Sequence, residues 1–369
     1  MTRNPLLEGI RVLDLSRLLP GPFCTLYLAQ MGAEVIKIED PKGGDGARGM
    51  SGDLFSLVNR GKKSVTMDLK LAEDVAVFKK LVADADVVIE SFRPGVMDRL
   101  GVGYEVLKAI NPKLVYAALT GYGQTGPYRD RPGHDMNYRG YSGELEMNAG
   151  FEGTPAVGNL QVADLAGGAL TCAVGILAAI IGAKASGVGS FVDVGMLDGT
   201  LALQVLSLTS LRTYGKTPPK GRDMLSGALP NYGVYECADG RFLAVGSLEM
   251  KFFHETLRLA GREDLKKMPP VPGKQGDVLR AELVTLFRSR TRDEWEALLA
   301  SEDTCVSAIL SPEEVLANEQ VVARGMIVDD GAGKPAFNLP IFFDNATAVN
   351  GRAPKLGADN DAVLGPLRG

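Results

Sequence analysis

The first half of this 369-residue chain alternates short β-rich runs with stretches of helical periodicity, and this alternation limits its fold more than any other feature. Runs rich in β-branched and aromatic residues, bounded by turn residues, are typical of strands and occupy residues 10–16, 34–39, 64–69, 86–92 and 114–123. Between them, apolar residues recur at the spacing of amphipathic helices. Because alternating strands and helices build a parallel sheet, we predict a Rossmann-like, doubly wound α/β fold. A sixth strand is expected within residues 191–199, where it leads into another apolar helix.

The second half has a different texture, and the chain is too long for one ordinary core. A segment rich in Pro and Gly predicts a linker at residues 201–230. Beyond it, residues 231–325 are expected to form a small α+β domain. The tail, residues 326–369, returns to β-like and loop-like sequence, and we expect it to complete the large domain of residues 1–200.

The small domain opens with the strongest hairpin signal in the chain. Two β-rich arms flank Asp239 and Gly240, a pair that suits the positive φ angles of a type I′ turn. The helices that follow carry N-terminal caps. Thr291 and Glu294 predict a capping box, and Ser311 is followed by a proline at the first helical position.

Composition and charge exclude several classes of function. The net charge of −5 argues against broad nucleic-acid binding, which requires an excess of Lys and Arg. The four cysteines form no CxxC pair and no His, Cys and carboxylate cluster has metal-ligand spacing, so we expect neither disulfides nor a metal. Such cysteines are typical of buried thiols in a reducing compartment. No signal-peptide pattern precedes the first strand, and we predict a cytoplasmic protein.

One apolar segment, residues 165–183, is long enough to suggest a membrane span. It is rich in Gly and Ala and follows Asp164 directly, which favours a helix buried at a close-packed interface. We therefore expect no membrane contact.

Three residues are candidates for acid/base chemistry. His134, in RPGHDMNYRG, is one of only two histidines and lies in a Pro-Gly turn. Asp164 begins the apolar helix, where it either caps the helix or acts as an acid or base with a displaced pKa. Glu249 opens a later helix, a position where an acid also complements the helix dipole.

Four cations flank predicted strands: Arg60, Lys62 and Lys63 in NRGKK, and Arg93 in SFRPG. Cations in such loops suit a phosphorylated ligand, and the alternative is a solvated basic loop. The turn after the first strand, SRLLPGPF, lacks the GxGxxG pattern, so nicotinamide binding is not expected.

Motifs along nearly the whole chain resemble the CaiB/BaiF group, also called class III CoA-transferases. They are GIRVLDLSRLLPGPFCTLYLAQMGAEVIKIE, NRGKKSVTMDLK, ADVVIESFRPGVMDRLGVGYE, TGYGQTGPY, QVADLAGG, GSFVDVGMLDG and LGADNDAVLG. Within the group, the sequences around His134 (GHDMNY), Asp164 (VADLAGG) and Glu249 (SLE) are similar to the α-methylacyl-CoA racemase branch.

The resemblance implies a racemase that interconverts (2R)- and (2S)-2-methylacyl-CoA thioesters by two-base proton transfer through an enolate. His134 and Asp164 would exchange the proton on opposite faces of the α carbon, and Glu249 would orient and charge His134. Imidazole suits this role because its unperturbed pKa is close to neutrality. An amide at the start of the Asp164 helix would hold the enolate oxygen. No cofactor is expected, since the CoA thioester is the substrate.

The resemblance also implies an interlocked homodimer, with the active site between the large domain of one subunit and the small domain of the other. Either subunit can then supply Glu249. The residues that match the group's CoA-binding loops are Arg60, Lys62, Lys63 and Arg93. Asp40 stands where relatives often place a cation near the CoA adenosine, which leaves Lys37 or Lys42 as substitutes.

Two other functions remain open. A CoA-transferase of the same fold would move CoA between carboxylic acids with Asp164 as nucleophile, and would need neither His134 nor Glu249. A non-catalytic CoA-binding protein would need none of the three. The presence of all three, with no glycine run longer than two, favours the racemase. The preferred acyl chain is not readable, because sterol side chains, branched fatty acids and arylpropionyl groups present the same acidic carbon.

Overall fold

The computed structural model describes residues 5–150 and 153–368, and the chain divides into two compact units. The sheet unit comprises Met1–Glu144, Gly158–Gln204 and Glu319–Gly369, and the hairpin unit comprises Leu145–Val157 and Val205–Asn318. The chain thus enters the hairpin unit twice, through a first short excursion that the sequence did not indicate.

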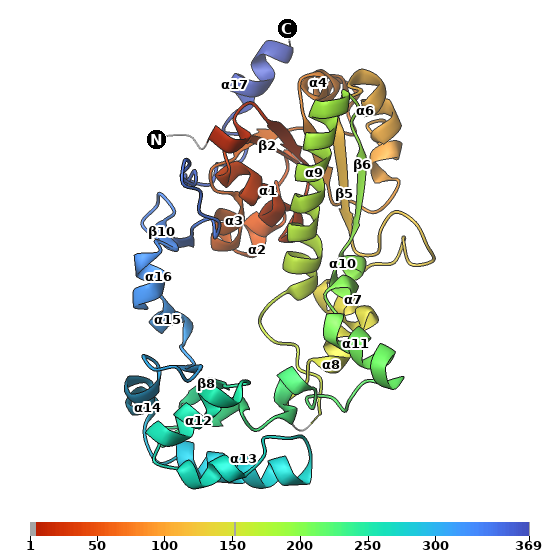
Figure 1. The fold of residues 1–369 in the computed structure, drawn as a ribbon. Helices are drawn as coiled ribbons and strands as arrows, with labels where there is room; N and C mark the ends of the chain where they lie inside the picture. Colours follow the sequence, from red (N-terminus) through yellow and green to blue (C-terminus); the bar gives the residue numbers. More distant parts are fainter. Residues whose placement is uncertain (1–4, 151–152, 369) are drawn as a thin grey trace. The chain divides into compact units, whose positions relative to one another are not determined.

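Six parallel strands form the sheet of the sheet unit, in the order β3-β2-β1-β4-β5-β6 (Figure 1). Their bounds are β1 (Arg11–Asp14), β2 (Glu34–Glu39), β3 (Lys63–Thr66), β4 (Val87–Glu90), β5 (Val115–Thr120) and β6 (Phe191–Gly195). The predicted Rossmann-like parallel sheet is therefore confirmed, including its sixth strand. The chain runs outward from β1 to β3 and then returns to β4, so the strand order reverses between β1 and β4.

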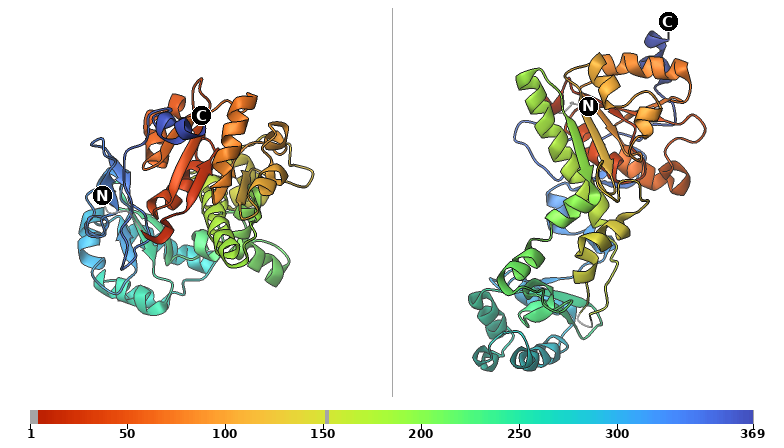
Figure 2. Two further views of the ribbon diagram at one scale, coloured as in Figure 1. Left: turned by 90° about the horizontal axis from the view of Figure 1, so that it is seen from above. Right: turned by 90° about the vertical axis from the view of Figure 1, so that its right-hand side faces the viewer.

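Helices cover both faces of this sheet (Figure 2). One core includes side chains of α1 (Pro20–Gln30) and α9 (Thr171–Ser186), and the other includes side chains of α4 (Ala72–Ala83) and α6 (Tyr104–Ile110). Successive strand residues join opposite cores, because side chains alternate across a strand. In β1, for example, Val12 belongs to the first core and Leu13 to the second.

Shorter helices precede, connect and follow the strands of this sheet. Their bounds are η1 (Pro5–Leu7), α2 (Ala47–Met50), α3 (Gly52–Asn59), α5 (Val96–Arg99), α7 (Asp135–Ser142), α8 (Glu144–Met147) and α10 (Met196–Ala202). The α8 helix lies where the chain leaves the sheet unit.

The helix that bears Asp164 begins with a π-helical stretch, η2 (Ala163–Leu170), and continues as α9. Two glycines let α10 approach it closely. A Cβ on Gly167 would lie 2.5 Å from Thr200 Oγ1, and a Cβ on Gly199 would lie 1.9 Å from the carbonyl oxygen of Gly167. The Gly-rich start of this helix is therefore required by packing, as the sequence suggested.

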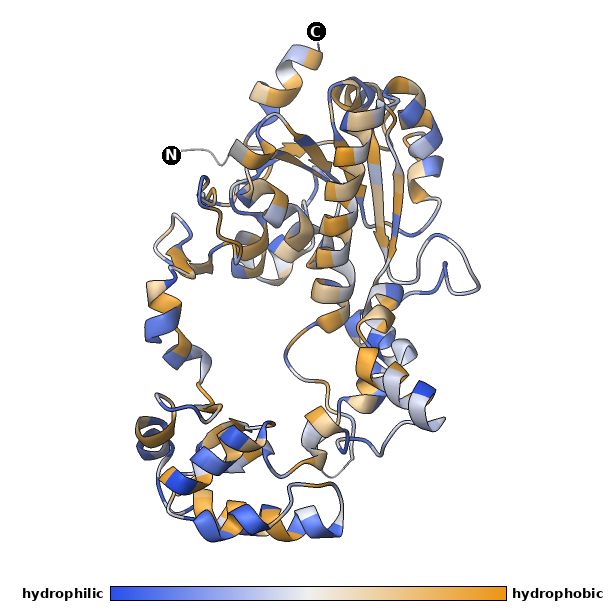
Figure 3. Cartoon of the chain, viewed as in Figure 1, coloured by the Kyte–Doolittle hydropathy of each residue, from blue (hydrophilic) through white to orange (hydrophobic). Residues whose placement is uncertain are grey.

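Within the described part of the chain, one helix, Ala163–Ser186, is long and apolar enough by length and composition to cross a membrane (Figure 3). Only one of its faces is buried in the single chain, through residues such as Ile176 and Ile180. On the other face Val174 is 68% exposed and Ile181 is 71% exposed. The helix was expected to be buried, and in the single chain this holds for one face, while the other face is exposed.

The tail lies along the edge strand β3. Asp359 Oδ2 accepts a hydrogen bond of 2.8 Å from the Ser64 amide, and Asn360 Oδ1 accepts one of 2.8 Å from the Thr66 amide. These side chains satisfy amides that an edge strand would otherwise expose. The elements of the tail are α16 (Glu319–Ala323), β10 (Ile327–Asp329), β11 (Pro335–Phe337), α17 (Asn360–Leu364) and η5 (Gly365–Leu367).

The hairpin unit contains a three-stranded antiparallel sheet of β7 (Tyr232–Glu236), β8 (Phe242–Gly246) and β9 (Val306–Ala308). The predicted hairpin is present, but the predicted type I′ turn is wrong. Gly240 has a φ of 74°, whereas Asp239 is not among the residues with positive φ. The Cys237 amide donates to the Arg241 carbonyl, so three residues form the connection and glycine takes its left-handed position.

Helices surround this sheet and bury Trp295 completely. Their bounds are α11 (Val205–Tyr214), η3 (Met224–Ala228), α12 (Met250–Leu259), η4 (Glu263–Lys267), α13 (Lys274–Phe287), α14 (Arg292–Leu299) and α15 (Pro312–Val315). The predicted cap pairs of Thr291 with Glu294, and of Ser311 with a proline at the next position, are confirmed. Helix α11 occupies part of the stretch expected to be a linker.

Candidate active site

A cavity of about 680 Å³ opens at the carboxyl ends of the parallel strands of the sheet unit. The loops after β1 and β4 both line it, through Leu18 and Arg93. These loops flank the point where the strand order reverses, which is where open α/β sheets bind ligands. Two candidate acid/base residues also line the cavity, His134 and Asp164.

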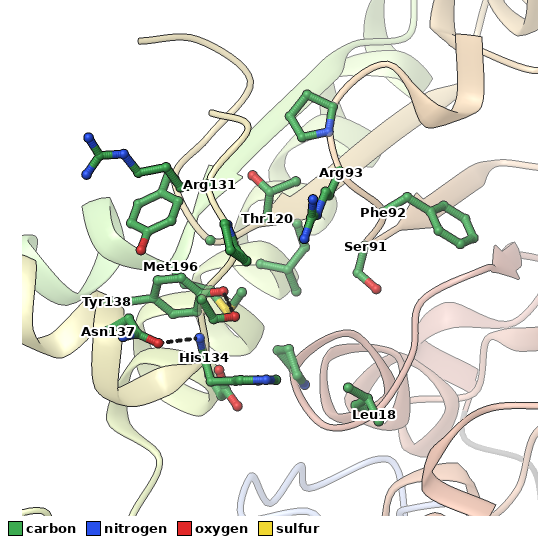
Figure 4. A pocket seen from close by; sticks show the side chains of 18 of the residues that line it. Leu18, Ser91, Phe92, Arg93, Thr120, Arg131, His134, Asn137, Tyr138 and Met196 are labelled. Atoms are coloured by element: carbon green, nitrogen blue, oxygen red, sulfur yellow. Dashed lines mark hydrogen bonds between the residues drawn. The ribbon is translucent and has the colours of Figure 1, made fainter. Parts of the chain in front are cut away.

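His134 is the residue that precedes α7, and its backbone is fixed by Asn137 (Figure 4). The His134 amide donates to Asn137 Oδ1 across 3.0 Å, and the His134 carbonyl accepts from the Asn137 amide across 2.8 Å. The side chain is exposed and lines the cavity. The imidazole can therefore accept or donate a proton on the cavity side.

Asp164 lies in the first turn of η2 and is partly buried. It does not cap its own helix, because Val162 already has helical backbone angles. Burial, and secondarily the nearby negative charge of Asp135, raise the pKa of Asp164 from 3.8 to about 7. A carboxyl group with this pKa exchanges protons readily near neutrality.

The helix of Asp164 is capped from outside by Asp135. Asp135 Oδ1 accepts hydrogen bonds from the amides of Ala163, at 2.7 Å, and of Asp164, at 3.2 Å. The Leu165 amide donates to the Gln161 carbonyl. These three amides are therefore occupied within the chain, so none of them is free to hold the enolate oxygen, and the predicted role of an amide at the start of this helix stays a prediction.

Glu249 belongs to the hairpin unit, where it is exposed and immediately precedes α12. Its side chain makes no cap hydrogen bond to that helix. Its partnership with His134 stays a prediction.

The predicted cations occupy different environments. Lys62 is buried, with its Nζ 3.2 Å from Asp14 Oδ2 and within hydrogen-bond distance of Pro22, Thr25 and Asn59 oxygens. Burial lowers the pKa of Lys62 to about 8, against the raising effect of Asp14. An ammonium enclosed by protein oxygens has no donor left for a phosphate, so the structure gives Lys62 a role within the fold.

Arg60 and Lys63 do not line the cavity either. The buried Arg60 guanidinium donates to the carbonyls of Leu57 and Phe337 and joins α3 to the tail. Lys63 is exposed on β3 and pairs with Glu34 across 2.5 Å. Of the four predicted CoA-binding cations, only Arg93 lies in the loops around His134 and Asp164.

Arg93 and Arg17 both line the cavity, one from each of the two loops at the strand reversal; Arg93 is labelled in Figure 4. Neither forms an ion pair with a carboxylate among the described residues, and Arg17 lies 4.8 Å from the ring centroid of Phe92. The sequence did not single out Arg17. Its position directly after the first strand, at a ligand-binding sheet edge, was the available signal.

A buried ion pair shapes the loop beside Arg17. Leu18 has a φ of 64°, a strained value for a branched residue, and its amide donates to Asp45 Oδ1 across 2.9 Å. Asp45 in turn pairs with Lys37 across 2.9 Å, with both side chains buried. Lys37 is thus engaged inside the fold, so of the two predicted substitutes for a cation near the CoA adenosine only Lys42 stays a prediction.

Comparisons with known proteins agree with this geometry. The family model described as CoA-transferase family III matches residues 7–360. The chain is 34% identical to the α-methylacyl-CoA racemase of Homo sapiens, over 97% of this chain and 92% of that protein. It is also 34% identical to the succinate–glutarate CoA-transferase of Agrobacterium fabrum, over 99% of this chain and 96% of that protein.

A solved structure shows the same fold. The crystal structure of a CaiB/BaiF family protein from Brucella suis is 31% identical, covers 99% of this chain and 100% of its own, and superimposes with a TM-score of 0.87. The chain belongs to CoA-transferase family III, the CaiB/BaiF group.

Proposed function

We propose that this protein interconverts the two epimers of 2-methylacyl-CoA thioesters by moving the α proton between His134 and Asp164. The observation that carries the proposal is that both residues line one cavity at the strand reversal, with the pKa of Asp164 raised to about 7. A two-base exchange requires one group in its acid form while the other is in its base form. A carboxyl group with an ordinary pKa would be almost wholly ionised at neutral pH, so little of the free enzyme would hold it in the acid form that protonates the enolate.

The enolate oxygen requires hydrogen-bond donors, and α7 offers them beside His134. The amides of Asp135 and Met136 are the first two of α7 and make no hydrogen bond within the described part of the chain. Amides in the first turn of a helix point out of its N-terminus and favour negative charge. We assign these amides the role that the sequence had given to the Asp164 helix.

The CoA group is assigned to the arginine-lined side of the cavity. Arg17 and Arg93 are placed to make charge-assisted hydrogen bonds to phosphates. The cavity lining also includes Leu119, Tyr122 and Met196, which offer apolar surface to a branched acyl chain.

The protein is proposed to act as a homodimer. The exposed apolar face of α9, with Val174 and Ile181, is unusual for a water-facing helix and suits coverage by a second copy. Within such a dimer, Glu249 of either subunit would orient and charge His134.

A CoA-transferase is the second candidate, because the Agrobacterium fabrum transferase is as similar in sequence as the racemase. There Asp164 would attack an acyl-CoA as a nucleophile and form an anhydride. This chemistry favours an ionised carboxylate, whereas the raised pKa of Asp164 leaves it substantially protonated at neutral pH.

One incubation separates the two candidates. Optically pure (2R)-2-methyldecanoyl-CoA is mixed with the protein in heavy water, without any free carboxylic acid. We expect deuterium at the α carbon, measured by mass spectrometry, and conversion to a mixture of epimers, measured by chiral chromatography. A protein that leaves the thioester unchanged until succinate or another acid is added, and then transfers CoA to it, is a transferase.

A further inference from the structure

The side chain that follows His134 in sequence points to Asp164 instead of the cavity. Asp135 is 9% exposed, and its Oδ1 accepts from both the Ala163 and Asp164 amides. Because His134 and Asp135 are adjacent along the chain, one carboxylate connects the backbone of the proposed imidazole base to the backbone of the proposed carboxyl base.

Two further charged side chains, Arg139 and Glu144, extend from this carboxylate, and we call Asp135, Arg139 and Glu144 together the relay. Arg139, one turn further along α7, is 1% exposed, and its Nη1 lies 3.4 Å from Asp135 Oδ2. The same guanidinium holds Glu144, with Nε 2.6 Å from Oε2 and Nη2 3.3 Å from Oε1. The charges along the relay therefore alternate: negative on Glu144, positive on Arg139 and negative on Asp135. The last carboxylate, that of Asp135, binds the amide of Asp164.

This relay costs more to bury than a cap requires. A neutral Ser or Asn satisfies a helix N-terminus as well as Asp does. An isolated buried Asp135 would suffer a large desolvation penalty, which its ion pair with Arg139 offsets, and Glu144 pairs with the same guanidinium. A buried polar network whose members are hydrogen-bonded to one another also rigidifies the segments that it joins, here α7 and the start of the Asp164 helix.

We infer that Asp135 is a positioning residue for the proton exchange, held by Arg139 and Glu144, and that it sets both the separation and the charge balance of His134 and Asp164. The inference rests on the proposed function for its catalytic consequence. Its structural and electrostatic content does not depend on which reaction the site performs.

The effect of the Asp135 charge on the pKa of Asp164 has a definite sign. Asp135 adds to burial in raising the pKa of Asp164. Tyr138, also on α7, faces the same carboxyl group, because Asp164 contributes to its raised pKa after burial. On the surrounding elements, Cys24 of α1 faces Cys172, and Asp198 of α10 lies near Asp193. The cavity that Asp164 lines adds further titratable side chains: Arg17, Arg93, Tyr122, Arg129, Arg131 and His134.

Three single substitutions test the relay. Asp135→Asn keeps an oxygen acceptor and removes a negative charge, Glu144→Gln removes the negative charge at the far end, and Arg139→Met removes the positive charge between them. The pKa of Asp164 is measured in each by carbon-13 NMR titration of labelled aspartate, assigned with Asp164→Asn. We expect it to fall in Asp135→Asn and Glu144→Gln and to rise in Arg139→Met.

Kinetics then test positioning. Asp135→Ala removes the cap, and a displacement of about 1 Å is expected to lower kcat on the order of a hundredfold with little change in KM. Asp135→Asn should retain a large part of the kcat that Asp135→Ala loses. Its pH–rate profile should shift to lower pH, in step with the lower Asp164 pKa expected in that variant. A cap that only stabilises the fold would lower the melting temperature without this sign pattern or this split between kcat and KM.

The outcomes separate this inference from the proposed function. An Asp164 pKa that is the same in all three variants and in the unmodified protein overturns the inference, even if racemisation is observed. Absence of α-proton exchange in the unmodified protein overturns the proposed function and leaves the NMR result to decide the relay. If Asp135→Asn fails to fold, Glu144→Gln and Arg139→Met still give opposite predicted shifts.

Discussion

The carboxylate of Asp135 accepts a hydrogen bond from the amide of Asp164 across 3.2 Å, although 29 residues separate them in sequence. His134 is joined to Asp135 by one peptide bond, so this contact holds the two proposed proton-transfer groups on neighbouring stretches of backbone. The cavity that they share lies where the strand order reverses. The site is therefore assembled from a loop after β5 and a helix that leads to β6.

Removing one base at a time should separate exchange from racemisation. In Asp164→Asn, His134 can still remove the α proton of one epimer, so that epimer gains deuterium while its inversion falls at least about a hundredfold. In His134→Ala the opposite epimer should keep exchanging. Both rates are measured with each pure epimer in heavy water.

His254→Gln is the matched control for that experiment, because it changes the other histidine, on α12, and should leave both rates unchanged. Near-normal racemisation by His134→Ala would contradict the assigned role of His134. Equal loss of exchange with both epimers in Asp164→Asn would contradict the two-base scheme.

The pH dependence should differ in sign between the two epimers. Asp164 must be ionised to remove a proton, so kcat/KM for the epimer it attacks should rise as pH increases through about 7. For the other epimer Asp164 must be protonated, so kcat/KM for that epimer should fall as pH increases through about 7.

The same raised pKa links Asp164 to the stability of the fold. Asp164 contributes stability at low pH that is lost as pH rises through about 7, so Asp164→Asn should gain stability relative to the unmodified protein above that pH.

Arg93→Gln should weaken binding of the CoA group. A hydrogen bond to a charged group contributes about 1.5–3 kcal/mol, so KM should rise by about tenfold or more while kcat changes less. Lys63→Gln is the comparison, because that exposed cation pairs with Glu34 outside the cavity. An equal rise of KM in both variants would show that the CoA phosphates do not bind at the side of the cavity lined by Arg93.

Lys62→Met should act on stability and not on KM. It removes the ammonium that pairs directly with buried Asp14, and breaking such a pair costs about 3–5 kcal/mol. Burial would raise the pKa of Asp14, but Lys37 and Lys62 hold it well below its usual range. This stabilisation is present above the ordinary carboxyl pKa and is lost as pH falls below it.

Denaturant unfolding at several pH values checks that prediction. The deficit of Lys62→Met should be largest near neutrality and should shrink at acid pH, where Asp14 becomes protonated. A deficit that does not change with pH would show that packing, and not the ion pair, explains the loss.

Gly167→Ala should destabilise the long helix by about 1–3 kcal/mol, because the new methyl would lie 2.5 Å from Thr200 Oγ1. Gly182→Ala, in the same continuous helix, meets no atom within 4 Å and should stabilise it by about 0.4–1 kcal/mol. Unfolding of both variants is followed by circular dichroism. Equal effects would show that helix propensity, and not contact with α10, decides the result.

The sequence by itself determined the sheet. Runs of β-branched residues between helical segments indicated all six strands, since a period-two or wholly apolar pattern records how a strand is buried on its two faces. It also identified His134, Asp164 and Arg93, which share the cavity, through the motifs that surround them. Cap pairs such as Thr291 with Glu294 were readable because they depend on neighbours three residues apart.

Only the tertiary structure decided what each polar side chain does. The adjacent cations Lys62 and Lys63 cannot be distinguished within NRGKK, because the burial of Lys62 depends on Asp14 and Thr25, which come from distant positions in the chain. Asp135 appeared only as the neighbour of His134, yet the fold brings it to the amide of Asp164. Local sequence specifies backbone periodicity, whereas burial, charge pairing and pKa depend on contacts between segments that the sheet brings together.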